Sequence, residues 1–167
     1  MDVAAGVRLL FLSCIVHLST NDIISLPKRS GYTGEFYNVV NQESKIVYLK
    51  TSKGALVGFF ESVNVSSLVY EVKVGKDINT QTVIRNSKSG PAMNSTTDPN
   101  LLLDNTRFKP FYFIWSHNSL VIGAGTVVGH GSTLQWSNDK DVTVRYISIR
   151  SGNLPLDYIF ELSCKKI

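Results

Sequence analysis

The sequence predicts an all-β protein, an antiparallel β-sandwich or jelly-roll-like single domain. Short runs rich in Val, Ile, Tyr and Phe recur along the chain between clusters of Gly, Asn, Asp and Ser. Several of these runs alternate polar with apolar side chains, which suits strands that have one face on a core. No segment combines the apolar spacing and the caps of an amphipathic helix.

Ten strands are expected from residue 35 onward, five on each side of a long polar break. They are expected at 35–40, 45–51, 55–61, 68–74, 80–85, 108–115, 120–123, 132–136, 142–150 and 156–162. The break, residues 86–106, contains the turn signals Ser-Gly-Pro and Thr-Asp-Pro. The three leucines at 101–103 are expected to pack back onto the domain as a short turn. Glu71 alternates with apolar neighbours, which predicts a solvent-facing carboxylate.

Length and composition limit the class of protein. The chain has 167 residues, of which 43% are hydrophobic and 18% charged, so a single globular domain is expected and a disordered or collagen-like chain is excluded. The net charge of +4 is spread along the chain and does not predict nucleic-acid binding. Two cysteines and three histidines without metal-ligand spacing make a metal site unexpected.

The N-terminus predicts export. A short charged stretch precedes the apolar run at 9–16, which is too short to span a bilayer. We therefore expect a signal peptide over residues 1–20, a lead-in over 21–34 and the β domain over 35–163. A buried first strand or helix is the alternative. No second stretch has transmembrane length, so the predicted location is secreted and extracellular.

Export gives meaning to two sequons and one cysteine. The sequons begin at Asn64 and Asn94, and Asn94 lies in a polar, turn-rich stretch. Signal cleavage would remove Cys14 and leave Cys164 as the last cysteine. A buried, reduced Cys164 is expected, with a disulfide-linked dimer through Cys164 as the alternative.

Several segments, taken together in order, resemble the animal family named for farnesoic acid O-methyltransferase. They are YEVKVG at 70–75, VIR at 83–85, FYFIW at 111–115, LVIG at 120–123, a tryptophan at 136 and VRYI at 144–147. The resemblance covers roughly residues 35–162. It implies the fold of that family's domain and, from the family name, methyl transfer to farnesoic acid.

Three departures from the family pattern fall at positions suited to a shared ligand surface. Residues 76–78 (KDI) replace a stretch that usually holds a tryptophan, and Asn153 and Leu154 follow Gly152 where another tryptophan is usual. Residues 54–56 (GAL) stand in place of Asp-Ala-His. The fold is therefore expected to carry over, whereas the family's binding specificity is not.

The residues do not predict catalysis. A methyltransferase needs S-adenosylmethionine, usually held by a glycine-rich turn between a strand and a helix. The glycines at 123–129 have the wrong spacing and precede a strand, so they predict a tight link between strands and no cofactor. The expected function is a secreted, non-enzymatic recognition module that binds a glycan or a small apolar ligand through its loops. The enzyme of the family name is the alternative.

Four residues are candidates for ligand binding. Arg85 ends a β-branched run and suits an anion or a sugar hydroxyl, or alternatively a salt bridge that holds the following loop. His130 lies between two glycines in a loop. Trp115 and Trp136 lie at strand ends, where each either packs in the core or offers a stacking platform. We expect Arg85, His130 and Trp136 to converge at one end of the sandwich, with Trp115 beneath them.

Overall fold

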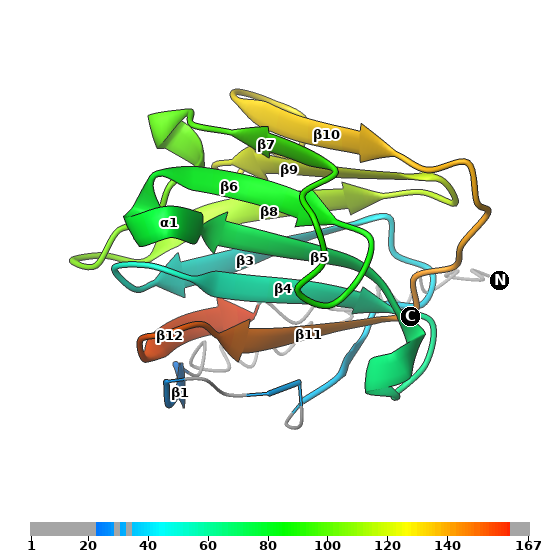
Figure 1. Cartoon of the computed structure of the whole chain (residues 1–167), viewed down its shortest axis with the longest axis horizontal. Coiled ribbons are helices and arrows are strands. Elements are labelled where there is room, and N and C mark those ends of the chain that lie inside the picture. The colour runs from blue at the N-terminus through cyan, green and yellow to red at the C-terminus, as the bar shows by residue number, and fades with distance from the viewer. Residues whose placement is uncertain (1–22, 29–30, 33–34, 161–167) are drawn as a thin grey trace, which may run out of the picture.

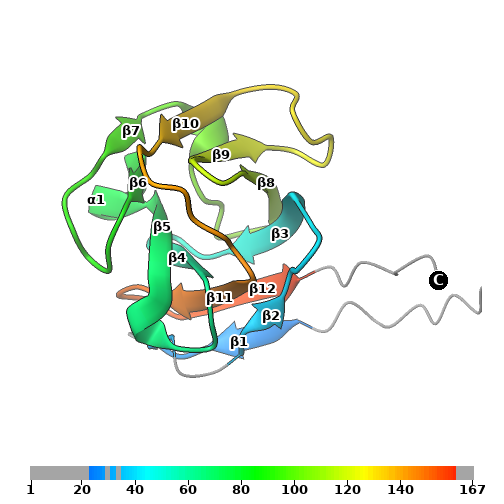
Figure 2. The same cartoon turned by 90° about the vertical axis from the view of Figure 1, so that its right-hand side faces the viewer.

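The computed structural model describes residues 23–28, 31–32 and 35–160. The expected signal peptide, Cys14 and Cys164 lie outside the described residues. Two antiparallel sheets of six strands each stack face to face (Figures 1 and 2), which confirms the predicted β-sandwich. Within the described ranges, no helix is long and apolar enough to cross a membrane.

Each sheet mixes strands from both halves of the chain. Sheet A has the order β1-β12-β3-β8-β9-β10, with bounds Ile24–Leu26, Leu156–Phe160, Ser44–Lys50, Lys109–Trp115, Ser119–Ala124 and Thr133–Ser137. Sheet B has the order β2-β11-β4-β5-β6-β7, with bounds Tyr37–Asn38, Tyr146–Ser151, Ala55–Phe60, Leu68–Gly75, Gln81–Arg85 and Asn94–Thr96.

The core lies between the two sheets and is rich in aromatic rings. Phe59, Tyr70, Phe111 and Phe113 are fully buried on the facing sides of β4, β5 and β8. The period-two alternation explains this, because successive side chains of a strand point to opposite faces of its sheet. Burying one such ring contributes about 1.5–3 kcal/mol to folding.

The predicted strands are largely confirmed, with two that are shorter than expected. The strand expected at 142–150 begins only at Tyr146. Before it, Val142 N donates to His117 O, and Arg145 N donates to Phe60 O, so this stretch passes from one sheet to the other. The strand expected at 35–40 is reduced to β2, which pairs with β11 for two residues.

Two strands were not predicted. The lead-in contributes β1, which pairs with β12, so the sandwich begins before residue 35. The polar break contributes β7, which pairs with β6. Both are edge strands of three residues: β7 (Asn-Ser-Thr) has no apolar residue, and the alternation of β1 (Ile-Ser-Leu) is too short to give a periodic signal. The same break holds a short 3-10 helix, Pro99–Leu101, and buries Leu101, which confirms the short turn expected there.

Three glycines meet at one end of the sandwich. Gly54 N donates to Gly75 O at 3.1 Å, and a Cβ at Gly54 would lie 3.4 Å from Gly152 Cα. The turn labelled α1, Lys76–Asn79, lies at this end (Figure 1) and has left-handed φ values at Asp77, Ile78 and Asn79. The three departures from the family pattern therefore lie close together in space.

Candidate functional site

Arg85 lies on the outer face of sheet B, in a set of residues we call the Glu71 cluster. Along β5, Glu71 points away from the core that Tyr70 and Val72 face. Its carboxylate is fully buried nonetheless, and it accepts four hydrogen bonds. The donors are Arg85 Nη1 at 3.1 Å, Arg150 Nη2 at 2.8 Å, Tyr32 OH at 3.0 Å and Ser89 N at 3.0 Å.

The Glu71 cluster clamps the loop between β6 and β7. Burial by itself would raise the pKa of Glu71, but the hydrogen bonds from Arg150 and Ser89 bring that pKa below its ordinary value. The bond from Ser89 N ties the loop at 86–93, which passes in front of β5 in Figure 1, to the sheet. The prediction of a solvent-facing Glu71 is therefore wrong, because Tyr32 and this loop cover the outer face. Of the two roles considered for Arg85, the structure shows the salt bridge: Arg85 pairs with Glu71, which in turn holds the following loop through Ser89 N.

Both tryptophans face the core from sheet A. Trp115, Leu120 and Trp136 lie opposite one another on β8, β9 and β10. Trp115 is 5% exposed and its ring centre lies 5.8 Å from that of Phe59. Trp136 is partly exposed and packs edge-on against Tyr70, with ring centres 5.7 Å apart. Trp115 is therefore a core residue, and Trp136 packs against the core with part of its side chain exposed.

His130 lies on the opposite side of the molecule from Arg85. The Tyr112 ring lies on the outer face of sheet A against Gly123, and its hydroxyl donates to His130 O at 2.9 Å. Arg85 thus lies outside sheet B, Trp136 between the sheets, and His130 outside sheet A. The expected convergence of these three residues is wrong. A sandwich separates residues by the face on which each strand places them, and motif order along the chain does not show that face.

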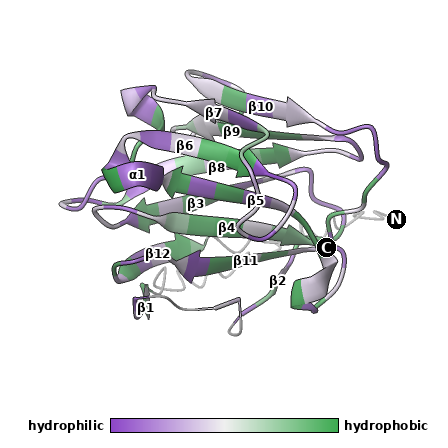
Figure 3. Ribbon diagram, in the orientation of Figure 1, coloured by the Kyte–Doolittle hydropathy of each residue, from purple (hydrophilic) through white to green (hydrophobic). Residues whose placement is uncertain are grey.

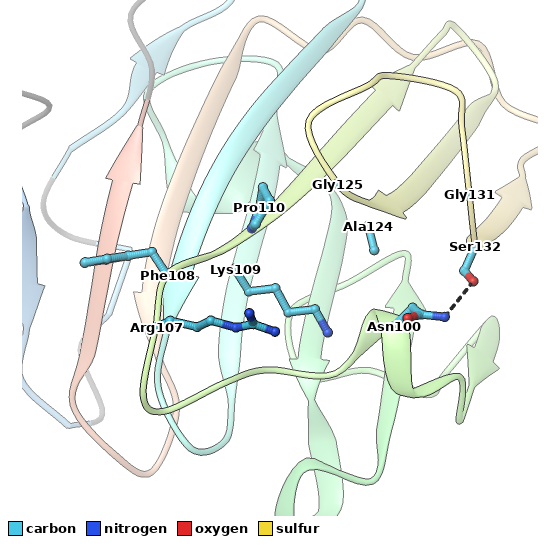
Figure 4. Close-up of a pocket in the computed structure, with 9 residues that line it drawn as sticks. All are labelled: Asn100, Arg107, Phe108, Lys109, Pro110, Ala124, Gly125, Gly131 and Ser132. Carbon is cyan, nitrogen blue, oxygen red and sulfur yellow. Dashed lines mark hydrogen bonds between the residues drawn. The ribbon is translucent and has the colours of Figure 1, made fainter.

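The loop that carries His130 does border a cleft of about 540 Å³, which we call the glycine-loop cleft. Figure 4 shows the residues that line it: Asn100, Arg107, Phe108, Lys109, Pro110, Ala124, Gly125, Gly131 and Ser132. The segment joins β9 to β10, as expected for a link between strands, but it is a loop over residues 125–132 and is not tight. Gly125 and Gly131 have φ values of 114° and 85°, and a Cβ at Gly125 would meet no atom within 4 Å. The backbone there is open to a ligand.

Hydrogen-bond donors project into the cleft. The Arg107 side chain is 79% exposed, and its Nε donates to Asp104 Oδ2 at 3.0 Å. The Thr106 hydroxyl is the main cause that lowers the pKa of Asp104 to about 2, so this carboxylate stays ionised. Neither Nη atom of Arg107 has a partner among the described residues. They are available to a ligand.

The remaining walls are fixed by internal contacts. Lys109 Nζ donates to Pro99 O at 3.1 Å and Leu102 O at 2.7 Å. Asn100 Nδ2 donates to Ser132 Oγ at 3.3 Å, the bond dashed in Figure 4. The ammonium of Lys50 lies 5.7 Å from the centre of the Phe108 ring. The cleft therefore combines preset donors with two apolar surfaces, Phe108 and Pro110.

The sequence patterns did not predict that Asn100, Arg107, Phe108 and Lys109 line a cleft. The available signal was two cations on either side of an aromatic residue, where the polar break meets the strand. It is weak, because long cationic side chains commonly flank strands at the surface.

A family model described as farnesoic acid O-methyltransferase matches residues 31–165 of the chain. A galectin-1-L2 from Dario rerio is 10% identical, with a TM-score of 0.52, and the match covers 84% of this chain and 98% of that one. A congerin II liganded with lactose and MES is 11% identical (TM-score 0.46; 84% and 97% covered). A prokaryotic β-1,3-1,4-glucanase from a mouse hindgut metagenome is 13% identical (TM-score 0.47; 83% and 77% covered). No curated protein sequence matches the chain significantly.

Proposed function

The chain belongs to the farnesoic acid O-methyltransferase family, and we propose that it is a non-enzymatic recognition module that binds a glycan in the glycine-loop cleft. The observation that carries this proposal is the lining of the cleft. The unpartnered Nη atoms of Arg107, the Asn100 amide and the Ser132 hydroxyl suit the hydroxyl groups of a sugar. The ring of Phe108 suits the apolar face of a sugar ring.

A glycan fits this cleft better than a small apolar ligand does. Pockets for small apolar molecules bury most of the ligand, whereas this cleft is open enough to leave the Arg107 side chain 79% exposed. Here Asn100, Arg107, Lys109 and Ser132 contribute polar atoms along the wall. Gly125 and Gly131 let a ligand approach backbone groups closely, and such groups hydrogen-bond hydroxyls well.

The family name points to methyl transfer instead, and the local geometry argues against carrying that activity over. The glycine-rich segment passes from β9 into the antiparallel strand β10. A nucleotide-binding turn would instead lead into a helix, whose N-terminus holds the phosphate.

Arg107→Gln tests the proposal on an array of defined oligosaccharides. The wild-type protein is expected to bind a restricted set of glycans, and Arg107→Gln to weaken that binding by about tenfold, the effect of losing one charge-assisted hydrogen-bonding group. Arg145→Gln removes an equal charge from an exposed residue in the crossing before β11, and should bind as the wild type does. Wild-type protein that binds no glycan, or equal losses in the two variants, would contradict the proposal.

We also propose that the protein is secreted and glycosylated. Asn64 and Asn94 are both exposed. Asn94 Nδ2 donates to Gln135 O at 2.6 Å, and an attached glycan would leave one of its two hydrogens for that bond. In a eukaryotic secretory host, the protein is expected in the medium without its first residues, up to about residue 20. Deglycosylation should lower the mass of the wild-type protein by two glycans. In Asn64→Gln and in Asn94→Gln it should lower the mass by only one. A cytosolic product that retains Met1 would exclude export.

A further inference from the structure

The outer face of sheet B carries more cations than its internal contacts need. Lys73 lies on the same face of β5 as Glu71, two residues further along. Arg150 is paired with Leu56, which is paired with Lys73, and Arg85 is paired with Glu71. Figure 3 shows hydrophilic stretches on β5 and β11 on either side of the largely hydrophobic β4. Arg85 and Arg150 therefore contact the Glu71 carboxylate, and Lys73 lies beside them on the same face of the sheet.

The charges at this face do not balance. Two arginines share the Glu71 carboxylate, and each has a buried Nε with no hydrogen-bond partner. Lys76 contacts Asp77 at 3.2 Å, and Gln81 Nε2 also donates to Asp77. Lys73 makes no hydrogen bond or ion pair with any described residue. Among the described residues of this face, Arg85, Arg150 and Lys73 thus share the single carboxylate of Glu71, and Lys73 is the cation that does not contact it.

We propose that Lys73, with Arg150 and Arg85 beside it, forms a binding site for an oxyanion, either a sulfate ester or a carboxylate; that a sugar carries this oxyanion rests on the proposed function. An oxyanion beside Lys73 would neutralise the excess charge at a partly buried position, where charge pairs are screened less than on open surface. Arg85 and Arg150 are held in place by Glu71, so they need little reordering to contribute their field.

The electrostatic state of Lys73 agrees with this geometry. Burial lowers the pKa of the Lys73 ammonium, and the neighbouring charges of Arg85, Lys76 and Arg150 lower it further, whereas Asp77 acts in the opposite direction. A bound oxyanion would raise that pKa. This site lies on the outer face of sheet B, and the glycine-loop cleft is bordered by the loop outside sheet A, so either site can fail without the other.

Calorimetric titration of the full chain tests the site with three disaccharides that share one backbone: unmodified, sulfated and uronic acid-containing. We expect the sulfated or the uronic form to bind, or both, and the unmodified form not to bind at this site. Lys73→Gln should lower the affinity for the acidic disaccharide by about tenfold or more, whereas Lys73→Arg, which keeps the charge, should retain most of the wild-type affinity. Lys140→Gln, which removes an equal charge from an exposed residue after β10, should change the affinity less than about twofold.

Three outcomes would overturn this site. The first is that neither acidic disaccharide binds. The second is that Lys73→Gln and Lys140→Gln weaken binding equally, which indicates nonspecific attraction between charges. The third is that binding is lost in Arg107→Gln and kept in Lys73→Gln, which places the acidic sugar in the glycine-loop cleft. The last outcome would leave the proposed function intact. The melting temperature of Lys73→Gln should match that of the wild type, and NMR titration of the Lys73 ammonium provides an independent readout, because its pKa should rise when ligand is bound.

Discussion

Replacing Glu71 by glutamine is expected to lower the free energy of unfolding by about 3–5 kcal/mol, the cost of leaving buried cations without their counter-charge. Glutamine preserves the size of the side chain, so the loss comes from the charge. Arg85 and Arg150 would both remain on the covered face, each already with one unpaired buried Nε. The loop at 86–93 would also lose a charge-assisted bond at Ser89 N. Chemical denaturation of the two proteins measures the difference.

The pH dependence of stability gives this prediction a second readout. The pKa of Glu71 in the folded protein lies below its ordinary value of 4.5. Its contribution to stability is therefore complete above that value and is lost as the pH falls through the lower folded pKa. The free energy of unfolding of Glu71→Gln should therefore fall less than that of the wild type as the pH is lowered. Glu61→Gln, at an exposed residue after β4, is the matched control and should change stability by less than about 0.5 kcal/mol. Equal stability of the Glu71 and Glu61 variants would contradict the buried-clamp interpretation.

Replacing Gly123 by alanine is expected to disable the glycine-loop cleft. The new Cβ would lie 2.0 Å from Tyr112 Cζ and 2.2 Å from its hydroxyl, so the ring would have to move. That movement would break the bond from Tyr112 OH to His130 O, which holds the loop. We expect a stability loss of about 1–3 kcal/mol from the overpacking and a loss of glycan affinity of at least about tenfold.

The neighbouring tyrosine provides the control for Gly123→Ala. If the clash with Tyr112 causes the loss, then adding Tyr112→Leu should make the two substitutions strongly non-additive in stability. Tyr112→Phe removes only the hydroxyl bond, so it should loosen the loop and cost about 0.5–1.5 kcal/mol. Additive losses in the double variant, or a Gly123→Ala protein that binds as the wild type does, would contradict this account of the loop.

The sequence predicts the sandwich well because the period of two extends through its long strands. In 156–162 and 68–74, alternation alone places Tyr158 and Tyr70 toward the core, where the structure has them. It fails at β7, which has no apolar residue, and at β1, where Ile24 and Leu26 pack on the core but alternate over only three residues. It also fails at Glu71: alternation correctly places this residue on the outer face, but it does not show that Tyr32 and a loop cover that face. The candidate site depends on such long-range contacts, so only the loop that carries His130 was found from the sequence.

The most direct test of recognition in the glycine-loop cleft is the amide NMR spectrum of the ¹⁵N-labelled protein during two titrations. One titrant is the neutral oligosaccharide that the array selects, and the other is S-adenosylmethionine. We predict saturable shifts for the oligosaccharide at Gly125, Gly131 and Ser132, their loss in Gly123→Ala, and no shifts with S-adenosylmethionine. Saturable, stoichiometric shifts with S-adenosylmethionine, or oligosaccharide shifts that avoid the cleft, would contradict the account.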